Sequence, residues 1–312
     1  MPDIVIAFFA FGLVAGLLKS DLKVPQSIYE TLSILLMLVL GLKGGMALHG
    51  QASLSMLPDL LSVAAMGIAL PLLCYPLLRC AVRLTNADAV SIAAHYGSVS
   101  AGTFAVVLAL AEKSGLVLLP ETTLYLVMLE LPAIVVMLGL YGALTQQGKQ
   151  GQIWREALTS RGVLLLGGGV LIGYLYGPEG LAPIEPALIG GFKTMLALFL
   201  LEMGLCTAKV CHPLPWAYWR LMVFAALAPF ALATIGFGIG VWLNLPAGSL
   251  LVLTTLAASS SYIAAPAAVR ASIPDANIGL AMLASLGITF PVNVLLGVHI
   301  YQGWVEAWMV AA

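Results

Sequence analysis

Long apolar stretches fill almost the whole of this sequence, and they decide which solvent the fold needs. Each stretch is close in length to a bilayer-crossing helix, which takes about 20 apolar residues. Of the 312 residues, 61% are hydrophobic and only 9% are charged, so a soluble fold would lack the polar side chains to cover its surface. We therefore expect an all-α integral membrane protein with ten transmembrane helices. The predicted spans are 3–18, 27–47, 58–82, 88–112, 122–145, 162–177, 187–208, 218–243, 247–270 and 277–302.

Charge and cysteine usage exclude other classes of protein. The formal net charge is −1 and no basic run is present, which argues against a nucleic-acid partner. The four cysteines stand in apolar segments at positions 74, 80, 206 and 211, a spacing that matches neither a zinc site nor a disulfide framework. The lipid bilayer is the partner that the composition requires.

The distribution of Lys and Arg predicts the orientation. Linkers on one side of the membrane hold ten of the thirteen basic residues, and the other side holds Lys43, Lys113 and Lys193. Because cytoplasmic loops carry the excess of basic residues, we expect a multi-pass protein of the inner cell membrane with both termini outside the cytoplasm. The ten residues are Lys19, Lys23, Arg79, Arg83, Lys149, Arg155, Arg161, Lys209, Arg220 and Arg270.

Three pairs of segments indicate an internal duplication. Residues 40–46 correspond to 200–206, residues 97–103 to 258–264, and residues 130–133 to 289–292, at offsets of 160, 161 and 159. A nearly constant offset predicts two five-span repeats, residues 1–150 and 151–312. Because five is odd, the second repeat enters the membrane inverted, a design that recurs in secondary transporters.

Hydroxyl-rich interruptions occur at matched positions in spans 4 and 9. Gly-Ser-Val-Ser-Ala-Gly-Thr interrupts the first span, and three serines followed by Pro266 interrupt the second. A half-helix that begins at such a break directs unpaired N–H groups and a positive dipole end into the gap, which favours an anion. For one such cluster alone, close helix packing is the favoured explanation, but two matched clusters favour a binding site near the midplane. The candidate substrate ligands are Ser98, Ser100, Thr103, Ser259, Ser260 and Ser261.

At these residues the sequence resembles the sodium-dependent bicarbonate transporter family known from cyanobacteria. The resemblance covers nearly the whole chain and is clearest at four segments, namely residues 41–47, residues 99–103, Leu-Ala-Ala-Ser-Ser-Ser at 256–261 and Arg-Ala-Ser-Ile-Pro-Asp-Ala-Asn at 270–277. It implies a homotrimer in which an elevator-like core (spans 3–5 and 8–10) moves against a scaffold (spans 1, 2, 6 and 7). Bicarbonate and Na⁺ would bind between the crossed breaks of spans 4 and 9. Tyr262 stands where the family carries an acidic residue, and the family's long cytoplasmic linker is absent, so no regulatory partner is assigned.

Glu130 is the acidic residue that lies deepest in a predicted span. A carboxylate at membrane depth is costly unless it is paired, protonated or beside a cavity. We expect Glu130 to bind Na⁺, together with Ser285 and Thr289 of the tenth span, or to act as a protonatable coupling group. Glu202 lies in the segment that corresponds to the one around Lys43, and a structural charge pair across the scaffold is as well supported as a role in transport.

Four functions remain open from the residues. The first is sodium-coupled symport of bicarbonate or a similar small anion by alternating access, with Na⁺ as the coupling ion and no other cofactor. The second is a proton-coupled carrier of an organic anion. An intramembrane hydrolase would need a base beside a nucleophile, and His95 shares a helix face with Ser98; we interpret His95 instead as a hydrogen-bonded core residue and expect no enzyme activity. A receptor-like helical protein is the fourth.

Overall fold

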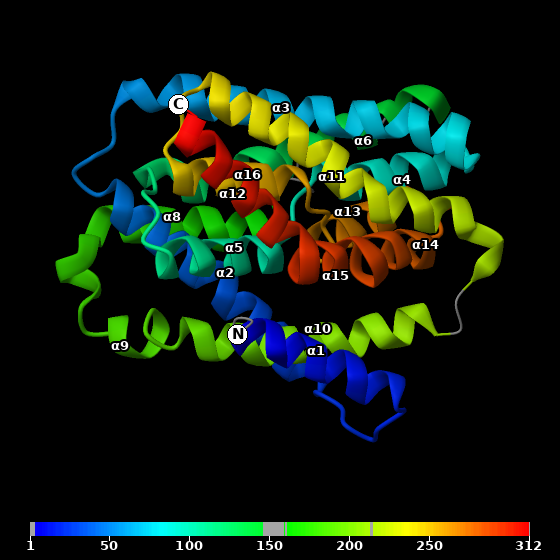
Figure 1. Ribbon diagram of the computed structural model, residues 1–312, viewed down its shortest axis with the longest axis horizontal. Coiled ribbons are helices and arrows are strands. Elements are labelled where there is room, and N and C mark those ends of the chain that lie inside the picture. The colour runs from blue at the N-terminus through cyan, green and yellow to red at the C-terminus, as the bar shows by residue number, and fades with distance from the viewer. Residues whose placement is uncertain (1–3, 146–158, 160, 213–214, 312) are drawn as a thin grey trace.

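The computed structural model describes residues 4–145, 159, 161–212 and 215–311, and every element assigned in them is helical (Figure 1). The boundary predicted between the two repeats, at residues 150 and 151, lies outside this part of the chain. The longer elements are α1 (Ile4–Leu17), α2 (Gln26–Leu48), α3 (Leu57–Leu77), α4 (Asn86–Gly97), α5 (Ala101–Lys113), α6 (Leu124–Thr145), α8 (Arg161–Leu181), α10 (Phe192–Cys211), α11 (Trp219–Trp242), α12 (Ala247–Ala257), α13 (Ala264–Ser272) and α16 (Val298–Ala311). The shorter elements are η1 (Leu54–Met56), η2 (Leu78–Val82), η3 (Pro120–Thr123), α9 (Glu185–Leu188), η4 (Trp216–Tyr218), α14 (Ile278–Met282), η5 (Leu283–Thr289), α15 (Phe290–Val292) and η6 (Asn293–Gly297).

Seven helical segments in the described residues are long and apolar enough to cross a membrane. They are Gln26–Leu48, Leu54–Val82, Asn86–Lys113, Pro120–Thr145, Glu185–Cys211, Trp216–Trp242 and Ile278–Val310. The other three predicted spans coincide with α1, which is shorter, with α8, and with α12 followed by α13. An all-helical, multi-pass architecture is therefore confirmed, whereas the number ten and the inverted repeat stay predictions.

Glycines let two pairs of helices pack closely. α2 lies along α8, and α1 lies along α10. A Cβ atom at Gly41 would lie only 2.5 Å from the carbonyl oxygen of Leu166, so any larger residue there would push α2 and α8 apart. Contacts of this kind between small residues are the usual way in which helices associate without water. The α1–α10 pair occupies the lower edge of Figure 1.

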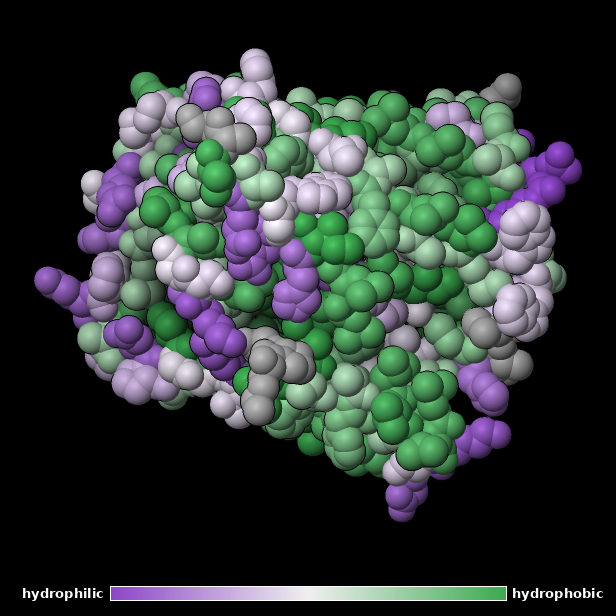
Figure 2. Space-filling view, in the orientation of Figure 1, coloured by the Kyte–Doolittle hydropathy of each residue, from purple (hydrophilic) through white to green (hydrophobic). Residues whose placement is uncertain are grey.

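The long axis of the molecule has polar ends. Hydrophilic residues gather at both ends of this axis, and hydrophobic residues cover much of the face between them (Figure 2). The C-terminal ends of α1, α3 and α10 and the N-terminal end of α11 all point toward the right-hand side of Figure 1. The loops at that end carry several of the basic residues that the orientation prediction used.

Candidate functional site

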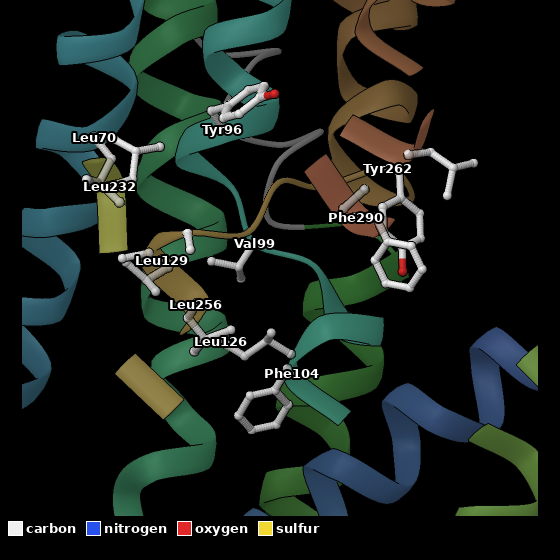
Figure 3. Close-up of a cluster of buried hydrophobic side chains, with 14 of the residues drawn as sticks. Leu70, Tyr96, Val99, Phe104, Leu126, Leu129, Leu232, Leu256, Tyr262 and Phe290 are labelled. Carbon is white, nitrogen blue, oxygen red and sulfur yellow. The ribbon is translucent and has the colours of Figure 1, made fainter. Parts of the chain in front are cut away.

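Two interrupted helices cross inside the bundle. α4 ends at Gly97 and α5 begins at Ala101, while α12 ends at Ala257 and α13 begins at Ala264. The segment between α4 and α5 is extended, with φ of −83° and ψ of 148° at Ser98. Figure 3 shows the segment around Val99 passing beside the segment that leads to Tyr262. The breaks predicted in spans 4 and 9 are therefore present.

Hydrogen bonds join the two breaks directly. The Ser261 N–H donates to the carbonyl oxygens of His95, at 2.7 Å, and of Ser98, at 3.1 Å. The Ser100 N–H donates to Ser259 Oγ at 3.1 Å. Backbone groups freed inside a membrane must find partners in the protein, and here each break supplies partners for the other.

The six predicted substrate ligands are all buried, but they divide into two sets. Ser100 Oγ caps α5 by accepting the Thr103 N–H at 3.0 Å, and Ser261 Oγ accepts the Ala265 N–H of α13 at 3.2 Å. Ser259 Oγ donates to the Leu256 carbonyl at 2.8 Å while it accepts from Ser100. These three hydroxyls stabilise the breaks. Side-chain oxygens without a partner in the described residues belong to Ser98, Thr103 and Ser260.

A small cavity lies where the two half-helices begin. Its volume is about 10 Å³, measured as the space open to a water-sized sphere, which is about what one water molecule needs. Ala101 and Ala264, the first residues of α5 and α13, line it together with Ser100, Ser261 and Glu130. The cavity thus brings both predicted helix N-termini, two predicted anion ligands and the predicted cation ligand to one place.

Glu130 is the most deeply placed acid beside this cavity. Its side chain is 2% exposed, and its Oε1 atom has no hydrogen-bond partner in the described residues. A Cβ atom built on Gly162 of α8 would lie 2.5 Å from that Oε1, so Glu130 reaches from α6 to the neighbouring α8. Buried polar atoms are rarely left without a partner, which marks this oxygen as a candidate ligand of an ion.

Ser285 and Thr289 lie elsewhere in the bundle. Ser285 Oγ donates to the Ala281 carbonyl within its own segment at 2.7 Å. Thr289 Oγ1 donates to the Ala225 carbonyl of α11 at 2.7 Å and lies 2.6 Å from the Tyr96 hydroxyl. Neither residue lines the cavity beside Glu130. The structure therefore does not bring the three predicted Na⁺ ligands together.

A vestibule of about 700 Å³ adjoins the small cavity. Tyr262, Ile263 and Ala264 line both spaces and separate them. Arg161, at the start of α8, and Arg270, near the end of α13, also line the vestibule. The vestibule therefore lies between α8 on one side and α13 on the other, and acidic residues, Glu30 and Glu202, line it as well as these basic ones.

Sequence reasoning noted Tyr262 only as a departure from the family. The ring of Tyr262 packs edge to face on Phe290, with centroids 5.1 Å apart (Figure 3), and its hydroxyl lies against Gly102. Its position directly after three serines of a break was the signal available for a role at the site. Tyr262 is a barrier between cavity and vestibule in this conformation.

Three further residues complete the comparison with the sequence. The interpretation of His95 as a hydrogen-bonded core residue holds for one of its two ring nitrogens. Nδ1 lies 2.7 Å from the Ser91 carbonyl oxygen, while Nε2 has no partner in the described residues.

The prediction of a charge pair between Glu202 and Lys43 is wrong, because Lys43 Nζ lies 2.6 Å from Glu112 Oε1. Glu202 instead lines the vestibule and accepts a hydrogen bond from Cys206.

The chain matches a known protein family. The family model described as the Na⁺-dependent bicarbonate transporter superfamily matches residues 4–306, nearly the entire chain. No curated protein matches the chain.

Proposed function

Because this chain belongs to the Na⁺-dependent bicarbonate transporter superfamily, a family of transporters and not of enzymes, we propose that it carries bicarbonate together with Na⁺ across the inner cell membrane. The two ions would load at the crossing of the broken helices and be released through the vestibule.

The charge arrangement around the small cavity is the observation that carries this proposal. Two helix N-termini meet there, at Ala101 and Ala264, beside the carboxyl group of Glu130. Each N-terminus is equivalent to about half a positive charge, so the pair offsets one carboxylate. Adding bicarbonate alone, or Na⁺ alone, would leave one uncompensated charge inside the membrane, which is costly. Loading both ions keeps the site balanced, and this supports obligatory coupling.

The size of the cavity supports a division of roles. Room for one water-sized particle suits a single Na⁺ beside Glu130, whose Oε1 atom is free to bind it. Bicarbonate has four non-hydrogen atoms and is too large for this cavity, so it would enter only when the barrier at Tyr262 moves. It would then bind the unpartnered hydroxyls of Ser98, Thr103 and Ser260 together with the helix N-termini. Ser285 and Thr289 stay in the proposal as ligands of a separate Na⁺ position.

The remaining features of the proposal concern movement and assembly. α3–α6 and α11–α16 would form the core, with α1, α2, α8 and α10 as the scaffold, and the two halves of the chain would be inverted repeats. The core would slide as an elevator, the chain would assemble as a homotrimer, and both termini would lie outside the cytoplasm. The close α2–α8 and α1–α10 pairs support a rigid scaffold.

A proton-coupled carrier of an organic anion is the second candidate, and the unpartnered carboxyl oxygen of Glu130 favours it. In that case Glu130 would bind a proton where the first proposal has Na⁺. Glu130→Gln separates the two, because a proton carrier would lose its pH dependence whereas a Na⁺ carrier would lose Na⁺ affinity.

Uptake of ¹⁴C-bicarbonate into proteoliposomes tests the proposal. The protein should accumulate label when Na⁺ is higher outside, and not when K⁺ replaces it. Glu130→Gln should remove the Na⁺ dependence, while the exposed control Glu179→Gln should leave it unchanged. Equal uptake in K⁺, or uptake driven by a proton gradient alone, would contradict sodium coupling.

A further inference from the structure

An apolar groove runs between α3 with η2 on one side and α11 on the other. Its volume is about 440 Å³, within the range of small-molecule sites. Buried Cys74 and half-buried Val82 line one wall, and Leu227 and Ala231 line the other. Arg220 is the charged residue in this lining. The groove therefore suits a molecule with a long apolar part and one anionic group.

The groove lies on a surface that faces hydrocarbon. The spans that contain α3 and α11 are only 33% and 28% buried within the protein, compared with 47–94% for the other five candidate spans. Leu77 and Leu227, which line the groove, are 54% and 62% exposed. A concave apolar surface in this position is filled from the bilayer.

The length of the groove matches one leaflet. Along α11 its lining extends from Trp219 to Leu232, which is roughly 20 Å at 1.5 Å per residue. A hydrocarbon core is about 30 Å thick, so the groove covers one leaflet from its edge to beyond the midplane. A single acyl chain spans the same depth.

Arg220 places a positive charge at the mouth of the groove. Within the described residues no carboxylate lies within ion-pair distance of this half-buried arginine. Its Cζ atom lies 5.5 Å from the centroid of the Trp219 ring, and Trp is enriched where a span meets the lipid headgroups. Arg83, next to Val82 of the opposite wall, adds a second exposed cation nearby. A lipid phosphate at this level would supply the missing counter-charge.

We propose that this groove binds one phospholipid with an anionic headgroup, whose phosphate pairs with Arg220 and whose acyl chain lies along α11. Binding of the lipid does not depend on the transport proposal. If that proposal also holds, α3 and α11 are both parts of the moving core, and the lipid moves with them.

Retention of lipid by the purified protein tests the groove. The protein is reconstituted in vesicles of equal parts dioleoylphosphatidylglycerol and dioleoylphosphatidylcholine, extracted in mild detergent and weighed intact by native mass spectrometry. We expect one phosphatidylglycerol per chain to resist repeated detergent washing. Arg220→Gln should lower its retention at least tenfold, and Ala231→Trp, which fills the groove at an exposed position, should do the same. Lys23→Gln, in a loop at the same end, is the matched control and should retain the lipid.

Each other outcome overturns the proposal in a different way. Loss with Ala231→Trp alone would show an apolar occupant without an anionic group. Equal retention of both lipids by all variants would show bulk lipid only, and a dimer that Ala231→Trp dissociates would show that a second copy fills the groove. Thermal unfolding of each variant distinguishes loss of lipid from loss of fold.

Discussion

Lys43 and Glu112 form an ion pair whose removal should shift the protein away from the conformation described here. Lys43 is on α2, Glu112 is on α5, and Lys43 Nζ also lies 5.2 Å from the centroid of the Phe192 ring of α10. In the proposed division, α2 and α10 belong to the scaffold and α5 to the core. Glu30, which lines the vestibule, is thirteen residues before Lys43 on α2, or roughly 20 Å away. The ion pair thus fastens core to scaffold at the end of the molecule opposite the vestibule.

The size of the effect follows from the exposure of the pair. The side chains of Lys43 and Glu112 are 21% and 38% exposed, and ion pairs of this kind contribute about 0.2–1 kcal/mol. In the conformation described here the vestibule is open. Lys43→Gln should therefore lower the ratio of molecules with an open vestibule to molecules with a closed one by about 1.4- to 5-fold, since 1.4 kcal/mol corresponds to a factor of ten.

Cys206 provides the assay, because it lines the vestibule and is half buried. In a background with Cys80→Ser and Cys211→Ser, and with Cys74 buried, the rate of maleimide labelling reports the vestibule-open fraction. Lys43→Gln and Glu112→Gln should each slow labelling, by at most about fivefold, and the double variant should slow it no further. The control Lys193→Gln, one residue from Phe192, should leave the rate unchanged.

Refutation would take one of two forms. Labelling at the wild-type rate in both single variants would show that the pair does not bias the conformation. Additive effects in the double variant would show that each residue acts through some other contact.

Two further predictions concern the crossing itself. Ser259→Ala removes the acceptor of the buried Ser100 N–H, so the free energy of unfolding should fall by about 1–3 kcal/mol. Ser259→Ala should therefore lower the melting temperature, and Ser259→Thr should restore most of the loss. An unchanged melting temperature in Ser259→Ala would contradict this prediction. Gly162→Ala places a Cβ atom 2.5 Å from Glu130 Oε1, so the carboxyl group must shift and the affinity for Na⁺ should fall in a ²²Na⁺ binding assay. The control is Gly167→Ala, whose new Cβ atom meets nothing within 4 Å and which should bind Na⁺ normally. Equal affinities of the two variants for Na⁺ would refute the placement of the ion beside Glu130.

The breaks in the helices could be predicted from local composition. Gly97 and the flanking serines have low helix propensity and compete for backbone groups, and Ser100 caps the following helix as its type suggests. Pro266 falls in the first turn of α13, where an N–H group would have no partner within the helix, so its absence breaks no helical hydrogen bond. These are local effects, and one sequence contains enough information for them.

Contacts between distant segments could not be predicted in the same way. Lys43 and Glu112 are 69 residues apart, and many acidic residues were equally available as partners. Thr289, in the segment that corresponds to the one at Glu130, was predicted to bind Na⁺, but its hydroxyl donates to the Ala225 carbonyl of α11, 64 residues earlier in the chain. Which hydroxyl faces the cavity depends on how the helices rotate against one another, and that is set by packing across the whole bundle.

Binding of ²²Na⁺ to the purified protein, with and without bicarbonate, tests the central claim most directly. If two helix N-termini and Glu130 balance a jointly loaded site, bicarbonate should raise the affinity for Na⁺, and Na⁺ should raise that for bicarbonate by the same factor. Glu130→Gln should abolish this coupling. An affinity for Na⁺ that is the same in the presence and absence of bicarbonate would contradict the account.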